Sequence, residues 1–173
     1  SPAPETKPVV QYTRKKVSKL KSINFVYRKV AGFNEKCRQM VSTPYGILAA
    51  TNRGLYHIRD KKASPVSADR YINFISWEPC GDKYFIAAAD GFFTIKYFDG
   101  NWVTDNPLPG LTDPIYSIAP INSEVIWLGG DNAAYKVKSG PSGSFPEFTK
   151  YSLTNDFPLR FNVSFIEDTV FLV

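Results

Sequence analysis

The sequence contains little of the side-chain chemistry on which most catalytic and metal sites depend. It has two cysteines and one histidine in 173 residues. Two cysteines are too few for a disulfide framework, and Cys37 and Cys80 occupy different places in the repeats described below, so we do not expect them to pair. A single histidine, His57, argues against a histidine-based triad or a His/Cys metal site. We therefore expect no catalytic residue, no metal and no cofactor, and a protein that is not an enzyme.

Long apolar stretches are also absent. No window approaches the roughly 18 consecutive apolar residues of a membrane-spanning helix. No signal peptide is visible, but an exported protein whose leader had been removed would look the same. These absences leave the location of the protein open.

The positive charge is concentrated near the start of the chain. Residues 1–36 carry nine Lys or Arg against two Glu, whereas the remaining residues carry twelve against fourteen acidic residues. The basic run Arg14-Lys15-Lys16 could attach to nucleic acid or to an anionic membrane. No paired aromatic platform, helix-turn-helix spacing or zinc ligand accompanies it, which favours a solvated linker. We expect residues 1–22 to be a flexible basic arm or linker, and we expect no nucleic-acid partner.

A repeated strand-turn-strand motif dominates the rest of the chain. Its copies begin at positions 47, 85, 126 and 170, which are separated by 38, 41 and 44 residues. The copies read Ile47-Leu-Ala-Ala-Thr-Asn-Arg-Gly-Leu-Tyr-His-Ile58, Phe85-Ile-Ala-Ala-Ala-Asp-Gly-Phe-Phe-Thr-Ile95, Ile126-Trp-Leu-Gly-Gly-Asp-Asn-Ala-Ala-Tyr-Lys-Val137 and Val170-Phe-Leu-Val173. A period of about 40 residues with this content is typical of a propeller blade.

Each copy is expected to sit inside a four-stranded unit. Further strands are predicted before the copies at 37–41, 71–76 and 161–166, and weaker ones after them near 64–66, 101–103 and 148–151. Turn residues such as Pro-Gly and Asp-Gly separate these strands, as antiparallel hairpins require. An additional alternating strand is predicted over 24–30.

The first strand of each copy is apolar on successive residues rather than on alternating ones. This pattern indicates a strand that is buried on both faces, as in a blade packed between two neighbouring blades, whereas a sandwich would alternate. We predict an all-β propeller over residues 23–173, with about four blade-like, four-stranded antiparallel repeats. The last repeat ends within its second strand, so the ring is expected to be incomplete. It would close in a longer sensor or by pairing in a homodimer, since an open edge invites association.

The repeat resembles that of the two-component regulator propeller family, which reads roughly Gly-x-Ile-Trp-Ile-Gly-Thr-x-x-Gly-Leu-x-x-Tyr/Ile. Residues Gly46 to Ile58 match this pattern closely, and Ile126-Trp-Leu-Gly129 keeps its core. The other copies depart from it, since Ala133-Ala134 replaces Gly-Leu and the second copy lacks one turn residue. The Gly-His and Trp-Asp pairs of WD repeats are missing, and a single Gly-Gly pair is a poor match to kelch repeats.

The resemblance implies a function as well as a fold. It implies the periplasmic or otherwise extracytoplasmic sensor region of a bacterial, membrane-anchored signalling protein, binding a carbohydrate or another small polar ligand. Two other classes stay open on the residues alone. One is a propeller enzyme acting on glycans, as a lyase or hydrolase, and the other is a protein-interaction scaffold.

The repeat also predicts where a ligand would bind. The turn between the second and third strands of each blade should open on the same face as the linkers between blades, so their polar residues should surround one axis, above an apolar surface that includes Trp127. The arginines are the stronger candidates, because no turn requires arginine, whereas Asn and Asp are common in turns. His57 is equivalent to Thr94 and Lys136, so we expect it to face solvent. The predicted ligand-binding residues are Asn52, Arg53, Arg70, Asp90, Asp131 and Asn132.

Overall fold

The computed structural model describes residues 28–79, 81–105, 108, 110–122, 124–140, 145, 147–152 and 160–173. Strands, turns and irregular connections make up these residues, and none of them forms a helix long and apolar enough to span a membrane. The predicted arm at 1–22 and Cys80 lie outside the described residues.

The strands form three four-stranded sheets and one two-stranded sheet, in which consecutive strands pair antiparallel. We call β1–β4 blade 1, β5–β8 blade 2, β9–β12 blade 3 and β13–β14 the C-terminal hairpin. The all-β, propeller-like fold is thus confirmed, with three complete blades and two strands of a fourth. The strands are β1 Cys37–Thr43, β2 Gly46–Thr51, β3 Gly54–Arg59, β4 Lys62–Ala68, β5 Ile72–Ile75, β6 Lys83–Ala88, β7 Gly91–Phe98, β8 Asn101–Asp105, β9 Ile115–Pro120, β10 Val125–Gly130, β11 Ala133–Lys138, β12 Glu147–Ser152, β13 Val163–Ile166 and β14 Thr169–Leu172.

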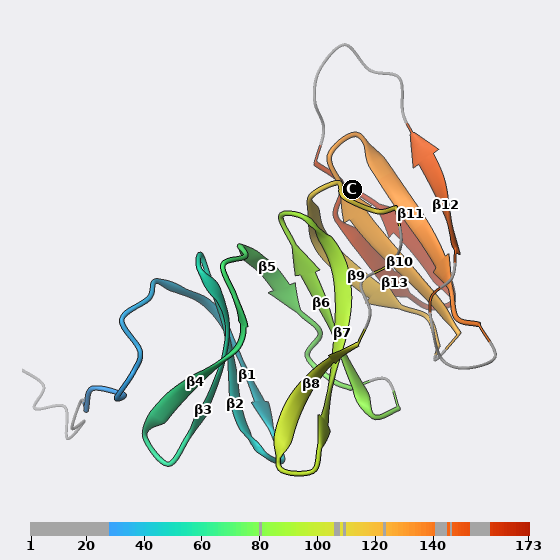
Figure 1. The fold of residues 1–173 in the computed structure, drawn as a ribbon. Coiled ribbons are helices and arrows are strands. Elements are labelled where there is room, and N and C mark those ends of the chain that lie inside the picture. Colours follow the sequence, from blue (N-terminus) through green and yellow to red (C-terminus); the bar gives the residue numbers. More distant parts are fainter. Residues whose placement is uncertain are drawn as a thin grey trace, which may run out of the picture.

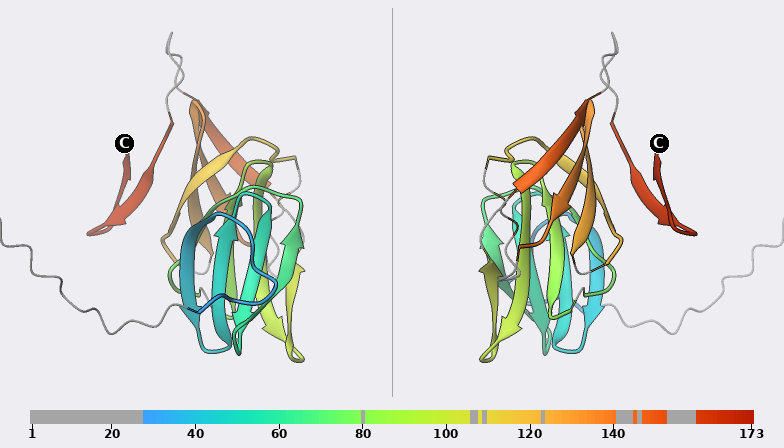
Figure 2. Two further views of the ribbon diagram at one scale, coloured as in Figure 1. Left: turned by 90° about the vertical axis from the view of Figure 1, so that its left-hand side faces the viewer. Right: turned by 90° about the vertical axis from the view of Figure 1, so that its right-hand side faces the viewer.

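The blades follow one another along an open arc (Figure 1). Blade 1 lies at one end of the arc, and the C-terminal hairpin lies at the other, beyond blade 3 (Figures 1 and 2). The first strands of successive units contact each other, β1 with β5, β5 with β9 and β9 with β13. The prediction that the ring is incomplete over these residues is therefore confirmed.

The second strand of each blade is buried on both faces, as its apolar sequence predicts. In β2, the four residues from Leu48 to Thr51 have no solvent exposure. In β6, Tyr84 to Ala88 are buried, and in β10 so are Leu128 to Gly130. Such strands lie in the middle of the packed arc, with one neighbouring strand on each side and apolar side chains above and below.

Each apolar core is shared between two neighbouring units. Leu48 and Leu55 of blade 1 pack with Ile86 and Phe93 of blade 2 in one cluster. Phe85 and Phe92 of blade 2 pack with residues of blade 3, including Leu128 and Tyr135, in a second. A smaller third cluster joins blade 3 to Val163 of the C-terminal hairpin. No blade therefore buries its apolar residues by itself.

Polar side chains join the first strands across the blade boundaries. The amide of Gln39 in β1 donates to the carbonyl of Ile75 at 2.9 Å and accepts the Ile75 N–H at 2.8 Å. Asn73 in β5 donates to the carbonyl of Ile115 at 2.8 Å. The hydroxyl of Ser117 in β9 donates to the carbonyl of Phe161 at 3.2 Å and accepts the N–H of Val163 at 3.0 Å. These bonds satisfy backbone groups that have no strand partner at the boundary.

A strand was predicted at 24–30, and the part of it that the structure describes is not a strand. Residues 28–30 have no regular structure, while 24–27 lie outside the described residues. Instead, Ala31 forms a parallel bridge with Lys62. Its N–H donates to the carbonyl of Lys61 at 2.9 Å, and its carbonyl accepts the N–H of Ala63 at 2.8 Å. The chain thus enters along the outer edge of blade 1, because the β4 edge offers unpaired backbone groups.

Candidate functional site

The first strand of each complete blade carries an irregularity at the same point. The pairing register shifts between Cys37 and Gln39, between Ile72 and Phe74, and between Ile115 and Ser117, where the partner residues are Gly129 and Gly130. The extra residues are Arg38, Asn73 and Tyr116. Bulges of this kind change the direction of a side chain and are common beside binding sites. Here they lie at the end of the blades where the predicted turns and linkers are found.

Two of the predicted residues meet directly. Arg70, in the linker from blade 1 to blade 2, forms an ion pair with Asp90, in the β6–β7 turn, with 2.6 Å between Nη2 and Oδ2. The Arg70 guanidinium also lies over the ring of Phe93, with Cζ at 4.6 Å from the ring centroid. Carboxylate and aromatic ring together fix the position of this half-buried arginine.

Asn52 and Arg53 form the turn between β2 and β3, and both are exposed. The carbonyl of Arg53 accepts the N–H of Asp69 at 3.0 Å, which places this turn beside the linker that carries Arg70. The four predicted residues of blades 1 and 2 therefore belong to one group. Within it, the Arg53 side chain extends into solvent, whereas that of Arg70 is held in place.

Asp131 and Asn132 form the turn between β10 and β11 in blade 3. The hydroxyl of Tyr116 donates to Asp131 Oδ2 at 3.1 Å, and the Arg160 guanidinium covers the Tyr116 ring at 3.7 Å from Cζ to the centroid. Asn132 has a φ of 57°, a left-handed conformation that asparagine tolerates better than most residues. A hydrogen bond from Asn73 joins β5 to β9, and these two strands connect the second group to the first.

Several residues beside these turns were not predicted from the sequence. Arg38 donates a hydrogen bond to the hydroxyl of Tyr71, and its Cζ lies 4.7 Å from the centroid of that ring. Tyr116 and Arg160 form the equivalent tyrosine–arginine pair at the far side. An alignment of the first strands would have placed Arg38 and Tyr116 at the same repeat position. The bulge that turns this position toward the neighbouring unit is revealed only by the structure.

Trp127 does not lie where we expected it. Its ring lies against that of Tyr151 of β12, with 5.2 Å between the centroids and a tilt of 31°, and the Lys136 ammonium lies 5.9 Å from the Trp127 ring centroid. It packs against the cluster that joins blade 3 to the C-terminal hairpin. The aromatic surface beside the turns comes from Tyr71 and Tyr116 instead.

A polar network fixes the linker before blade 3. The buried hydroxyl of Tyr135 donates to the carboxylate of Asp113, and the Lys150 ammonium donates to the same oxygen at 2.9 Å. The Tyr135 hydroxyl, followed by Lys150, holds the pKa of Asp113 below its ordinary value. Burial, and then the Asp113 carboxylate, raises the pKa of Tyr135. The ionised carboxylate and the neutral phenol therefore stabilise each other.

This network predicts a pH-dependent contribution to stability. Because the pKa of Asp113 is lower in the folded state than in the unfolded state, its contribution is fully present above the unfolded value, about 4, and is lost as the pH falls through the folded value. Asp113→Asn should be less stable than wild type at neutral pH, and the difference should shrink as the solution is acidified. Urea unfolding at several pH values would measure this. Asp168→Asn, in the exposed turn of the C-terminal hairpin, serves as control, and a difference for Asp113→Asn that did not vary with pH would contradict the prediction.

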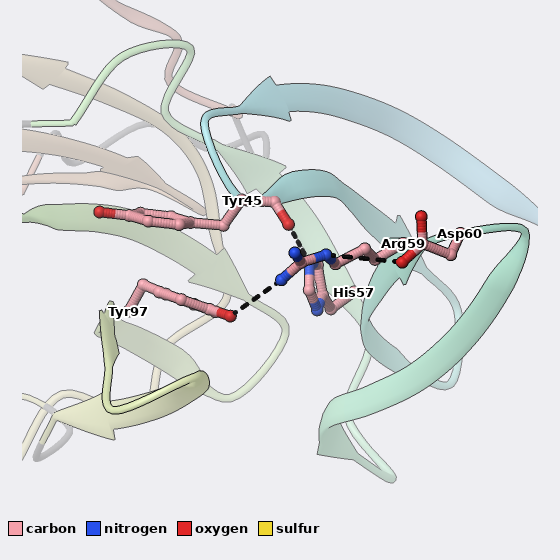
Figure 3. A network of polar contacts seen from close by, with 5 residues as sticks. All are labelled: Tyr45, His57, Arg59, Asp60 and Tyr97. Carbon is pink, nitrogen blue, oxygen red and sulfur yellow. Dashed lines mark hydrogen bonds and ion pairs between the residues drawn. The ribbon is translucent and has the colours of Figure 1, made fainter.

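The expectation that His57 faces solvent is wrong. Its side chain is half-buried between blades 1 and 2, where Nε2 lies 2.8 Å from the carbonyl oxygen of Tyr45 and therefore donates to it (Figure 3). The equivalent Thr94 is 1% exposed. This strand position faces the next blade, and His57 is accepted there because its hydrogen bond to Tyr45 is made within its own blade.

The predicted turns offer hydrogen-bond donors and acceptors, with the rings of Tyr71 and Tyr116 beside them. In the part of the chain that the structure describes, no three His, Cys, Asp or Glu side chains gather into a group that could hold a metal ion. Binding of a polar molecule is the chemistry that the arrangement suits.

Comparisons with known proteins show a likeness in fold to a solved structure. No family model and no curated protein match the sequence. Among solved structures, the fold is similar to the extracellular domain of a proposed hybrid two component system, BT4673 from B. thetaiotaomicron, with a TM-score of 0.63 and 14% sequence identity. The match covers 84% of this chain and 20% of that one, so the chain spans about a fifth of the length of its structural neighbour. At this identity the likeness concerns the fold alone.

Proposed function

We propose that this chain is part of a non-enzymatic, extracytoplasmic sensing module of a bacterial two-component-type protein, and that it binds a carbohydrate or another small polar ligand. The observation that carries the proposal is the gathering of the predicted turn and linker residues at one end of the blades. The likeness to the extracellular domain of a hybrid two component system supports a sensing role.

The ligand would lie against the ends of the first strands. Arg53 is the exposed arginine of the group, and it would donate to hydroxyl or carboxylate oxygens of the ligand. Arg70 would do the same from a fixed position, because Asp90 and Phe93 already restrict its rotamers. A side chain that is held in place before binding loses less conformational entropy when the ligand arrives.

The test uses two arginines at opposite ends of one strand. Arg53 immediately precedes β3 and Arg59 ends it. The wild-type chain should retain one or more members of an immobilised panel of neutral and uronic-acid oligosaccharides. Arg53→Ala should then weaken binding about tenfold or more in calorimetry, a loss expected of a charge-assisted hydrogen bond. Asp131→Ala should also weaken it, whereas Arg59→Ala should bind like wild type.

Both Arg→Ala changes are at exposed positions, so each should alter the unfolding free energy by only about 0.5 kcal/mol. Loss of binding in Arg59→Ala, with binding retained in Arg53→Ala, would place the ligand at the opposite end of the blades. The same incubations would be checked for shortened or unsaturated oligosaccharides, since product formation would instead support a glycan lyase or hydrolase.

A further inference from the structure

A concave surface lies at the end of blades 1 and 2 that is opposite to the predicted turns. Trp102 of β8 is surrounded there by Tyr45, Tyr84 and Tyr97, with ring centroids at 6.0, 5.7 and 5.3 Å from its own. The Trp102 ring plane stands at 81°, 73° and 69° to these three rings. Tyr45 and Tyr97 are themselves stacked at 4.0 Å, side by side in Figure 3. We call this set the aromatic cluster.

Sequence-distant segments build the cluster. Tyr45 belongs to the turn between β1 and β2 of blade 1, and the other three rings belong to blade 2. His57 holds the turn in place by donating to the Tyr45 carbonyl, and its own ring lies 5.9 Å from Trp102. A methyl group at Gly46 would lie 2.7 Å from His57 Nε2, so the turn and the histidine fit closely. The cluster is thus held by contacts between two blades.

A pocket of about 140 Å³ opens onto the cluster. This is smaller than the 300–1,000 Å³ typical of sites for drug-sized ligands, so the pocket suits a compact group rather than several sugar rings. Its lining is Pro44, Tyr45, Pro79, Gly81, Asp82, Tyr84, Tyr97 and Trp102.

The charge in this lining is negative. Asp82 is exposed, and among the described residues it has no ion pair. Two basic side chains at this end of the blades already face carboxylates. Lys83 lies 2.6 Å from Asp105, and Arg59 lies 3.7 Å from Asp60 while reaching the Tyr97 hydroxyl at 3.5 Å. A cation entering the pocket would therefore meet aromatic rings and one uncompensated carboxylate.

We propose that this pocket binds a compact organic cation of the quaternary ammonium type. Such a cation has no N–H to satisfy, and it gains its binding energy from the negative faces of several aromatic rings. Four aromatic rings line the pocket, three of them at steep angles to the ring of Trp102, and the Asp82 carboxylate supplies the balancing charge. The site is separate from the turns that carry the proposed sensing function, and it does not depend on that proposal.

The experiment compares choline with its neutral isostere, 3,3-dimethyl-1-butanol, in tryptophan-fluorescence titrations of the whole chain. Choline should bind saturably and about tenfold more tightly than the isostere, a ratio within the range of a cation–π site supplemented by one carboxylate. Asp82→Asn should remove most of this preference while leaving the isostere unaffected. The matched control is Asp168→Asn, a carboxylate in the turn of the C-terminal hairpin, which should titrate like wild type.

A second variant tests the rings independently of the charge. Tyr97→Leu should weaken choline binding, whereas Tyr97→Phe, which keeps the ring, should retain it. Equal binding of choline and the isostere, or an unchanged choline affinity in Asp82→Asn, would overturn the proposal. So would binding of methyl glucoside in the absence of choline binding, which would make the cluster a sugar platform. None of these results bears on Arg53 or Asp131.

Discussion

Replacing Phe93 by alanine is expected to lower the unfolding free energy by about 3–5 kcal/mol, the usual cost of deleting a fully buried phenyl ring. Phe93 is 1% exposed and lies in the cluster shared by blades 1 and 2. Its ring also supports the Arg70 guanidinium. The variant should therefore bind the ligand of the turns more weakly as well, because Arg70 loses the surface that positions it. Urea unfolding, followed by calorimetry on the folded fraction, would measure both effects.

The same strand provides the control. Phe98, at the end of β7, is 66% exposed, so Phe98→Ala should change stability by no more than about 0.5 kcal/mol. Phe93→Leu separates packing from the aromatic contact, since it should cost less stability than Phe93→Ala while still removing the ring under Arg70. A loss of stability in Phe93→Ala no larger than that in Phe98→Ala would show that the two blades do not share this core.

Gly129→Ala is the second change for which we expect a large effect. A methyl group at this position would lie 2.2 Å from the carbonyl oxygen of Phe161 and 2.5 Å from the hydroxyl of Ser117. The equivalent residues of blades 1 and 2, Ala50 and Ala87, carry that methyl and are fully buried. Overpacking against backbone atoms typically costs about 1–3 kcal/mol. Here the cost falls on the contact between β9 and the C-terminal hairpin, because Ser117 joins them.

Amide hydrogen exchange would localise the effect of Gly129→Ala. Val163 and Phe165 should exchange faster than in wild type, while the strands of blade 1 should keep their protection. Ala50→Gly is the reverse change at the equivalent place, and it should cost about 0.5–1 kcal/mol without altering exchange in the hairpin. Uniformly faster exchange throughout the chain in Gly129→Ala would contradict a local origin.

The fold could be predicted from the sequence because one pattern recurs in register. Residues that are apolar at successive positions, as in Leu48-Ala49-Ala50, can be buried on both faces only between two sheets, and the structure buries them there. The weak outer strands could be placed only by the turns that precede them, and β4, β8 and β12 do lie at those places. The match to two-component regulator propellers stays a resemblance, and the similar extracellular domain agrees with it at the level of the fold.

The site was less accessible to prediction, for a physical reason. The repeat fixes the turns, and Asp90 and Asp131 lie in equivalent turns of blades 2 and 3. It does not reveal contacts between units, which depend on how neighbouring first strands approach. Arg38 meets Tyr71, and Arg160 meets Tyr116, across such boundaries. His57 was misjudged for the same reason, since its surroundings belong partly to blade 2.

The hydrogen bonds of Gln39, Asn73 and Ser117 have a mechanical consequence. They join consecutive first strands directly, so these strands form one connected unit. Each sheet extends outward from this unit. A change in the angle between two neighbouring blades would displace the outer strands most and the first strands least. A molecule that bound near the bulges at Arg38 or Tyr116 would act close to the axis about which the blades rotate. A small displacement there would be converted into a larger one at β4, β8 and β12.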